Sequence, residues 1–373
     1  MKFFSYLIYS RIIYPSSKLE TFKQCQNFIE QPKFNLHDEY RALSYITEKS
    51  DYIQEKLFEN SKNVIKRNSN IIYYDCTNYF FEIDQDNDLR KYGISKEHRP
   101  NPIVGMGLFM DGAGLPLSFN IYLGNQNEQK TLIPEETKIV NNFKMDNTKM
   151  ILCTDAGLAS YKIIQTETKS IKQDLIVTFC FKYFDYNKNI KNSQIERAKK
   201  FIASNQALRK SKNQNDYKRF INNTKSTDNG EIAENNNLSL DEDLIKNEEK
   251  YDGYYALTTN LVGDIEQILK ISKGRWEIKK SFRIMKTDFL ARPVNLSRED
   301  RIKVHFMTCF ISLLIYRLLE KKSNYKYTTY EILKTLREMN LLESKGDGYL
   351  PEYTRTNLTD DHMKYLDLEQ IMK

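Results

Sequence analysis

The chain has 373 residues, and its 57 lysines and arginines exceed its 50 aspartates and glutamates by +7. This mild basic excess favours a polyanionic partner without requiring one. The five cysteines show no C-x-x-C spacing and the four histidines are scattered, which argues against a disulfide scaffold and a structural zinc site. A reduced, cytoplasmic chain fits this cysteine usage best.

The first 66 residues are expected to be helical. Apolar residues recur at helical spacing over 19–28 and 40–58, and Pro15 and Pro32 interrupt the pattern. The apolar opening MKFFSYLIYSRIIYPSS does not fit a signal peptide, because Arg11 breaks it and no small-residue cleavage site follows. Because the apolar pattern starts without a lead-in, we expect an N-terminal region that has been shortened.

From residue 70 the composition changes to one that favours strands. IIYYDCTNYFFEI predicts one strand, and NPIVGMGLFMDGAGLPLSFNIYLG predicts two more, joined by a glycine-rich turn at 111–114. A helix is expected over 129–143, followed by short buried strands at 150–154 and from 174 onward. This succession of strands and helices predicts an α/β sheet domain.

Residues 182–250 interrupt the domain with a polar segment that is basic in its first half and acidic in its second. The segment is typical of a solvated, partly disordered insertion, and the alternative is that its basic half lies along DNA. Strand composition returns at 251–261, and a helix is expected from 264 onward. A long helix is then expected over 297–322.

The apolar run 304–316 lies in this long helix. A helix needs about 20 apolar residues to span a bilayer, and this run is shorter, so we expect a buried core helix and no membrane partner. Residues 325–373 are expected to form a short helical tail.

Two aspartates stand out by their positions. Asp75 sits inside an apolar, aromatic strand, where charged residues are uncommon unless they face a site or a partner. Asp155 ends a short strand, a position where functional carboxylates often lie in open α/β sheets. Each alone could be a satisfied structural residue, with Asp155 capping a helix that starts near Leu158. Together they suggest a divalent-metal site, because carboxylate oxygens are the ligands that Mg²⁺ prefers.

A series of motifs then resembles a known family. The motifs are YYDCTNYFFE, HRPNPIVGMGLFMDGAGLPLSF, GNQNEQKTL, CTDAGLAS, YDGYYALTTNL, GRWEIKKSFRIMKTDFLARPV and EDRIKVHF. In combination they resemble bacterial insertion-sequence transposases of the DDE class, most of all the insertion-sequence-four superfamily. The resemblance covers nearly the whole chain.

The resemblance implies an α/β fold with an RNase H-like mixed sheet flanked by helices, a strand-containing insertion and a helical N-terminal region. Its implied boundaries are 1–66 for the helical region, 67–324 for the catalytic domain with its insertion at about 182–262, and 325–373 for the tail. It implies that the chain cleaves DNA phosphodiester bonds and transfers strands, with element ends and target DNA as partners. It also implies a homodimer on DNA, in the bacterial cytoplasm at the nucleoid.

The catalytic residues carry over motif by motif. In the family two aspartates and one glutamate hold two Mg²⁺ or Mn²⁺ ions, one activating the attacking oxygen and one stabilising the leaving oxygen. Asp75 and Asp155 match the two aspartates. The glutamate belongs to a helix with the pattern Tyr-x2-Arg-x3-Glu-x6-Lys, in which Arg275 and Lys286 match the arginine and lysine.

This chain departs from the pattern at the glutamate, because that position holds Lys279, and at the tyrosine, because that position holds Ser272. Neither nearby carboxylate is expected to replace the glutamate: Glu277 lies about 200° and Asp288 about 180° around the helix. An ammonium group here removes ligand oxygens and repels cations, so we expect impaired catalysis and doubtful metal binding. Lys279 is expected to pair with Asp75 and Asp155 instead.

The basic helix face is a candidate for contacts with DNA phosphates, which position a duplex without reading its sequence. The candidates are Arg275, Arg283, Lys286 and Arg292. The alternative is a solvated basic face. Trp276 is expected to pack in the core rather than to stack on a base, and the rings of Tyr79, Phe80 and Phe109 are also assigned to the core.

Three alternatives to an active transposase stay open at this point. One is a catalytically inactive DNA-binding remnant or inhibitor that occupies element ends. Another is an RNase H-fold nuclease that cuts DNA without joining it. A third is a decayed gene that yields no stable protein.

Overall fold

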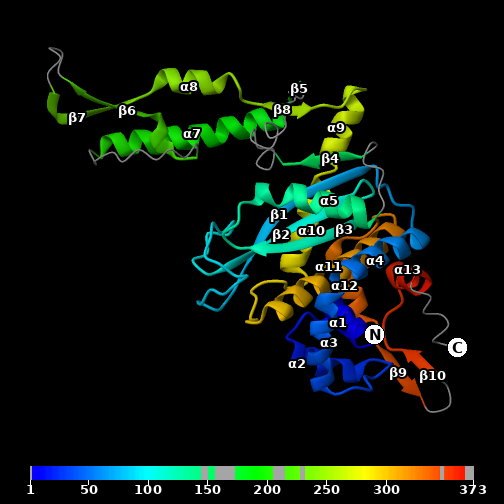
Figure 1. Ribbon diagram of the computed structural model, residues 1–373. Coiled ribbons are helices and arrows are strands. Elements are labelled where there is room, and N and C mark those ends of the chain that lie inside the picture. Colours follow the sequence, from blue (N-terminus) through cyan, green and yellow to red (C-terminus); the bar gives the residue numbers. More distant parts are fainter. Residues whose placement is uncertain are drawn as a thin grey trace. The chain divides into compact units, whose positions relative to one another are not determined.

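The computed structural model describes residues 2–143, 150–155, 173–204, 215–226, 232–344 and 348–365. The chain divides into two compact units, and Figure 1 labels the elements of both. The first unit joins residues 1–168 to residues 266–373, and the second holds residues 169–265. The expected insertion at about 182–262 therefore falls within the second unit.

The N-terminal part of the first unit is helical. Its helices are α1 (Lys2–Ile13), α2 (Lys18–Gln24), α3 (Leu36–Glu48) and α4 (Ser50–Val64), with a short 3-10 turn η1 (Cys25–Asn27) after α2. The Ser17 side chain accepts a hydrogen bond from the Glu20 backbone N–H and so caps α2. Arg11, on α1, is buried and donates to the carbonyl of Phe289, which ties this region to the C-terminal half of the unit.

The centre of the first unit is a four-stranded mixed sheet. Its strands are β1 (Ile71–Phe80), β2 (Ile103–Asp111), β3 (Pro116–Leu123) and β4 (Ile151–Thr154), in the order β3-β2-β1-β4. The first three pair antiparallel, while β4 runs parallel to β1. The turn expected at 111–114 is present, and Gly114 takes a φ of 74° there. This mixed sheet with its helices is consistent with the RNase H-like fold.

Successive side chains alternate between the two faces of the sheet. The even-numbered side chains Ile72, Tyr74 and Cys76 join a core cluster with Phe58 of α4 and the helix α5 (Leu132–Asn142), which follows a 3-10 turn η2 (Glu128–Lys130). The odd-numbered Tyr73 joins the larger core on the opposite face. The sheet is therefore covered on both sides.

The second face is covered by α10 (Trp276–Thr287) and α11 (Glu299–Lys322), which follow α9 (Ile265–Lys273). Along α11, Val304 to Leu314 are all buried, and each large apolar side chain so buried stabilises the fold by about 1.5–3 kcal/mol. Among the described residues α11 is the one helix long and apolar enough to cross a membrane, and 83% of its most apolar window is buried inside the protein. The expected core helix is confirmed.

The segment after α11 differs from the expected helical tail. It contains the helices α12 (Thr329–Glu338) and α13 (Asn357–Tyr365), but between them β9 (Leu341–Ser344) and β10 (Gly348–Pro351) pair antiparallel. Gly348 has a φ of 78°, a conformation that glycine adopts without strain. The tail therefore contains the expected helices, but a two-stranded sheet that was not predicted lies between them.

The second unit contains β5 (Asp174–Phe179), α7 (Phe181–Ala203), η4 (Tyr217–Phe220), β6 (Ile221–Ser226), β7 (Ile232–Leu240), α8 (Glu242–Glu249) and β8 (Tyr254–Thr259). Strand β5 pairs antiparallel with β8, and β6 pairs with β7. Phe220 and Ile221 are fully buried in a small core of their own. The described part of the expected solvated insertion is thus largely exposed, but it also contains this small core.

Strand β5 was expected to be buried, and this was wrong. Leu175 is 63% exposed and Val177 is 53% exposed. The strand lies in a two-stranded sheet with β8 rather than beside β1. An apolar run in a strand predicts burial on both faces when the strand lies inside a wide sheet, a condition that β5 does not meet.

Candidate active site

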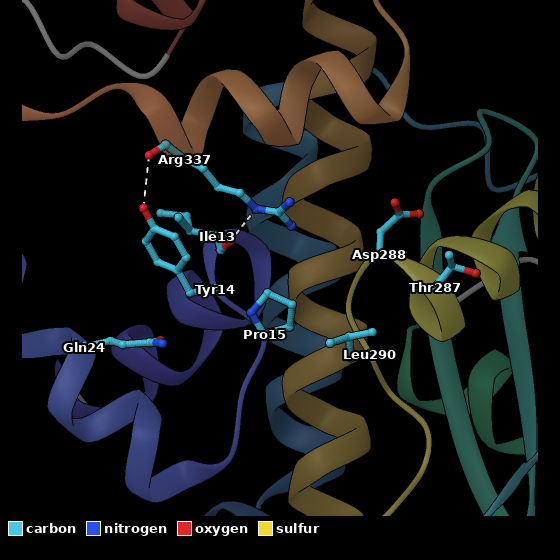
Figure 2. Close-up of a pocket in the computed structure, with 8 residues that line it drawn as sticks. All are labelled: Ile13, Tyr14, Pro15, Gln24, Thr287, Asp288, Leu290 and Arg337. Carbon is cyan, nitrogen blue, oxygen red and sulfur yellow. Dashed lines mark hydrogen bonds between the residues drawn. The ribbon is translucent and has the colours of Figure 1, made fainter. Parts of the chain in front are cut away.

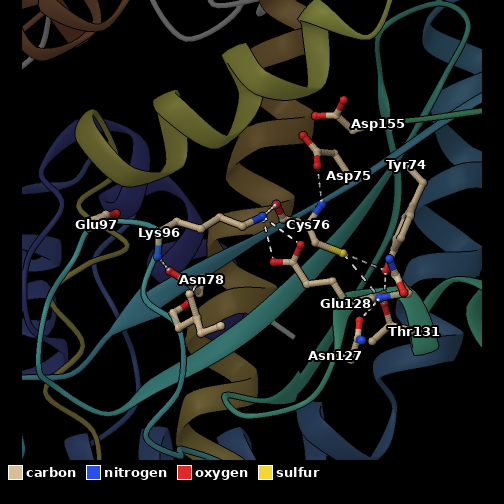
Figure 3. Close-up of polar contacts among 12 residues, drawn as sticks. Tyr74, Asp75, Cys76, Asn78, Lys96, Glu97, Asn127, Glu128, Thr131 and Asp155 are labelled. Carbon is tan, nitrogen blue, oxygen red and sulfur yellow. Dashed lines mark hydrogen bonds and ion pairs between the residues drawn. The ribbon is translucent and has the colours of Figure 1, made fainter. Parts of the chain in front are cut away.

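Asp75 and Asp155 meet because β1 and β4 run side by side. In the parallel register Tyr74 pairs with Thr154, so the next residue of each chain segment is the aspartate. Neighbouring strands lie about 4.8 Å apart, and residues at matching positions point to the same face. Asp75 shares the parity of Tyr73, whose side chain faces α10. Figure 3 shows the two carboxyl groups next to each other at this end of the sheet.

Two cationic side chains at the start of α10 form ion pairs with Asp155. The Arg275 guanidinium donates to the carbonyl oxygen of Thr154 at 2.9 Å and to Asp155 Oδ1 at 3.1 Å. Lys279 Nζ lies 3.5 Å from Asp155 Oδ2. The position matched to the family glutamate therefore lies at the site. Lys279 was expected to pair with both aspartates, and among the described residues it forms an ion pair with Asp155 but none with Asp75.

A glycine lets α10 approach the sheet closely. A Cβ on Gly274 would lie 2.1 Å from the Tyr73 hydroxyl oxygen, and this hydroxyl donates to the carbonyl oxygen of Ile271 at 2.9 Å. Any side chain at residue 274 would collide with the Tyr73 hydroxyl group and disrupt this hydrogen bond. Gly274 thereby sets the distance between Arg275 and the end of β4.

A third cation, Lys96, lies on the other side of Asp75. Its ammonium group donates to the Cys76 carbonyl oxygen at 2.6 Å and pairs with Glu128 at 2.8 Å. Burial raises the pKa of Asp75, and this rise is opposed by the Cys76 N–H that Asp75 accepts and by the charge of Lys96. The nearby Asp155 charge raises the same pKa further, and Lys279 lowers it.

On the side of α10 away from Asp155, charged residues form ion pairs with residues of α11. Glu277 accepts from Arg317, which is 1% exposed, and Lys280 Nζ lies 2.5 Å from Glu320 Oε1. Glu277 therefore points to α11, as its helical angle predicts. Asp288, the other nearby carboxylate, lines a separate cavity of about 480 Å³ with Tyr14 and Arg337 (Figure 2). Neither carboxylate replaces the missing glutamate.

The described residues do not fit the expected two-ion site. They contain no group of three or more histidine, cysteine, aspartate or glutamate side chains placed to hold a metal. Two carboxylates converge, but Lys279 brings an ammonium group to the place where the third is expected. Asp155 already pairs with Arg275 and Lys279, so the site offers few free oxygens to Mg²⁺ or Mn²⁺.

The four candidate DNA contacts do not form one surface patch. Arg275 binds Asp155, while Lys286 and Arg292 both bind Glu97, at 2.9 Å and 3.0 Å. Arg283 is exposed on α10. Three of the four candidates therefore meet carboxylates of the same chain, and one of them, Arg292, lies after the end of α10.

Trp276 was expected in the core, and this was wrong. Its side chain is 63% exposed. It is the first residue of α10, and the buried side of that helix is formed by Ile278, Phe282 and Met285. The rings of Tyr79, Phe80 and Phe109 are buried as expected.

Sequence reasoning missed Lys96, Glu97 and Glu128. All three lie in or beside the motifs that carried the resemblance. A lysine or glutamate in a loop does not indicate which residue it will pair with, so their partners could not be predicted. Figure 3 shows Lys96 reaching toward Cys76 and Glu128 below the aspartates. The alternative role for Asp155, capping a helix near Leu158, lies outside the described residues.

Comparison with known families gives one match. The family model described as "Transposase DDE domain" matches residues 89–315, more than half of the chain. The matched range includes Asp155 and all of α10, and it begins after Asp75. No curated protein sequence matches the chain. On the strength of the family match, the chain belongs to the transposase DDE domain family.

Proposed function

We propose that the chain is a DNA transposase of an insertion sequence, of the insertion-sequence-four type, whose strand cleavage and transfer are impaired. The ion pair between Lys279 and Asp155, 3.5 Å long, carries this proposal. Its partners are element-end and target DNA, with a homodimer on DNA, and its location is the cytoplasm at the nucleoid.

The impairment follows from the charge at residue 279. In two-ion phosphodiester cleavage the carboxylates hold the ions that activate the attacking oxygen and stabilise the leaving oxygen. A lysine in place of a glutamate supplies no ligand oxygen. Its charge also repels a divalent ion placed about 4 Å away by several kcal/mol, even at an effective dielectric of about 20.

With a lysine at residue 279, the site around Asp75 and Asp155 can still bind an anion. Lys96, Arg275 and Lys279 surround the two aspartates with three positive charges. Phosphate groups form short, charge-assisted hydrogen bonds with arginine and lysine. Our proposal is that DNA still binds here, held by side chains rather than by divalent ions.

A cleavage assay tests the proposal. The substrate is the DNA that flanks the coding sequence, incubated with Mg²⁺ or Mn²⁺ and either the natural chain or the Lys279→Glu variant. We expect the variant to cut at least about a hundredfold faster, because removal of a charge stabiliser from a catalytic centre typically costs 10²–10³ in rate.

Two further variants control this assay. Lys66→Glu makes the same charge change at an exposed residue outside the site, and it should stay as slow as the natural chain. Asp75→Asn in the Lys279→Glu background should abolish the gain. Equal cutting by the natural chain and by Lys279→Glu would defeat the proposal.

The same ion pair favours a second candidate, an inactive chain that occupies element ends and inhibits active copies. Adding the natural chain to the Lys279→Glu variant should then lower cleavage in proportion to the amount added. An RNase H-fold nuclease is distinguished by its products, since it would release cut ends without joining them to target DNA.

A further inference from the structure

Lys286 and Arg292 share one carboxylate oxygen. Lys286 Nζ lies 2.9 Å from Glu97 Oε1, and Arg292 Nε lies 3.0 Å from the same atom. Lys286 belongs to the last turn of α10, Arg292 to the segment after it, and Glu97 to the connection between β1 and β2. Three separate parts of the first unit therefore converge on one small site.

Two aromatic rings line this site, and a third cation, Arg99, lies over one of them. The Lys286 ammonium lies 5.2 Å from the centre of the Tyr79 ring. The guanidinium groups of Arg292 and Arg99 lie 5.8 Å and 5.0 Å from the centre of the Phe80 ring. Ring faces attract cations, so three positive charges are held together beside one carboxylate.

Glu97 fills this site incompletely. The Arg292 Nε–H is buried and makes no aligned hydrogen bond, although Glu97 Oε1 is 3.0 Å away. Burial lowers the pKa of Lys286, which means that its charge needs an anionic partner, and the Glu97 carboxylate raises that pKa in turn. A phosphate group has more acceptor oxygens than one shared carboxylate oxygen and can serve both cations.

Lys286 and Arg292 are already expected to contact DNA phosphates; we propose that in the free protein the Glu97 carboxylate occupies the position of that phosphate. Binding of DNA then requires the phosphate to displace the Glu97 carboxylate. The inference rests on the proposed function for the identity of the polyanion. It adds a built-in competitor that weakens DNA binding.

The test is binding of a fluorescent 30-base-pair duplex of arbitrary sequence to the full chain, a length chosen to be about three helical turns. The affinity of Glu97→Gln should exceed that of the natural chain by about three- to tenfold, because one competing charge is gone. A plot of log affinity against log salt concentration should steepen by about one unit, as for one more phosphate contact.

The controls separate this effect from a general change of charge. Glu299→Gln removes an exposed carboxylate that pairs with Lys303 at 2.6 Å, and it should leave the affinity within about twofold of the natural value. Lys286→Ala added to Glu97→Gln should remove the gain. Thermal melting of each variant shows whether the fold is intact.

The inference is overturned if Glu97→Gln weakens DNA binding, because Glu97 would then hold the two cations in place for the phosphate. It is also overturned if Glu97→Gln and Glu299→Gln bind alike. Neither outcome affects the proposed function, which fails by a separate result: a Lys279→Glu variant that binds DNA but does not cut it.

Discussion

At the scale of single residues, the ion pair of Lys279 with Asp155 depends on how neighbouring residues place the two side chains. The register of β1 and β4 brings Asp75 and Asp155 to one edge, and Gly274 lets α10 come close enough for residue 279 to reach them. The lysine and Arg275 then neutralise Asp155. A lysine at residue 279 thus gives a salt-bridged carboxylate at the place where the family resemblance implies an anionic site.

A histidine far from this site gives a residue-scale prediction on pH. His362 on α13 is buried, and burial lowers its pKa to about 4. Its usual pKa of about 6.5 applies in the unfolded chain. The unfolded chain therefore binds the proton more tightly, so the contribution of His362 is complete above pH 6.5 and is lost progressively as the pH falls toward 4.

We expect the free energy of unfolding to be about 2 kcal/mol lower at pH 5 than at pH 7 on account of this group. Urea unfolding at the two pH values measures it. His362→Leu should reduce the difference in free energy of unfolding between pH 7 and pH 5 by about this amount. The part of the difference that comes from His305, which is also buried with a lowered pKa, should remain. An unchanged difference in His362→Leu would contradict the prediction.

At the scale of elements, α10 is held by a buried charge network on the side opposite to the site. Arg317 of α11 binds Glu320 at 2.6 Å, donates to the Gly114 carbonyl oxygen at 3.0 Å and also binds Glu277 of α10. The network links α10, α11 and the turn between β2 and β3. It therefore fixes the helix that presents Arg275 and Lys279 to the aspartates.

Removing one partner of this network should be costly. In Arg317→Met the Glu320 side chain, 3% exposed, keeps its charge with Lys280 as its remaining cationic partner, and we expect a loss of about 3 kcal/mol in the free energy of unfolding, the low end of the cost of breaking a buried ion pair. The double variant Arg317→Met/Glu320→Gln should recover part of this loss, because the buried charge is gone. Urea unfolding measures both.

The exposed pair of Lys334 and Glu338 on α12 offers a matched control. Lys334→Met should change the free energy of unfolding by less than about 1 kcal/mol, since exposed ion pairs contribute little. A similar small effect for Arg317→Met would show that the network does not hold α10.

At the scale of the whole molecule, the features predicted best from the sequence are those set by local composition. Strand β1, the turn at 111–114 and the helix α11 follow from runs of strand-forming, turn-forming and apolar residues. The meeting of Asp75 and Asp155 follows from one further step, because both were placed at strand positions of one sheet. The family match adds the transposase domain to this picture.

The rest depended on contacts that composition does not encode. Lys286 and Glu97 are 189 residues apart in the chain, and nothing local marks them as partners. Trp276 was misplaced because a large aromatic side chain favours the core on average, whereas this one begins a helix whose apolar side lies elsewhere. Strand β5 was misplaced because its apolar run says nothing about how many strands its sheet contains.

Mn²⁺ binding measured by calorimetry tests the central claim most directly, because it needs neither the element-end sequence nor catalysis. The account predicts no saturable binding to the natural chain at millimolar Mn²⁺, binding to Lys279→Glu, and loss of that binding when Asp75→Asn is added. Saturable binding to the natural chain that matches Lys279→Glu in affinity and disappears in Asp75→Asn would contradict it.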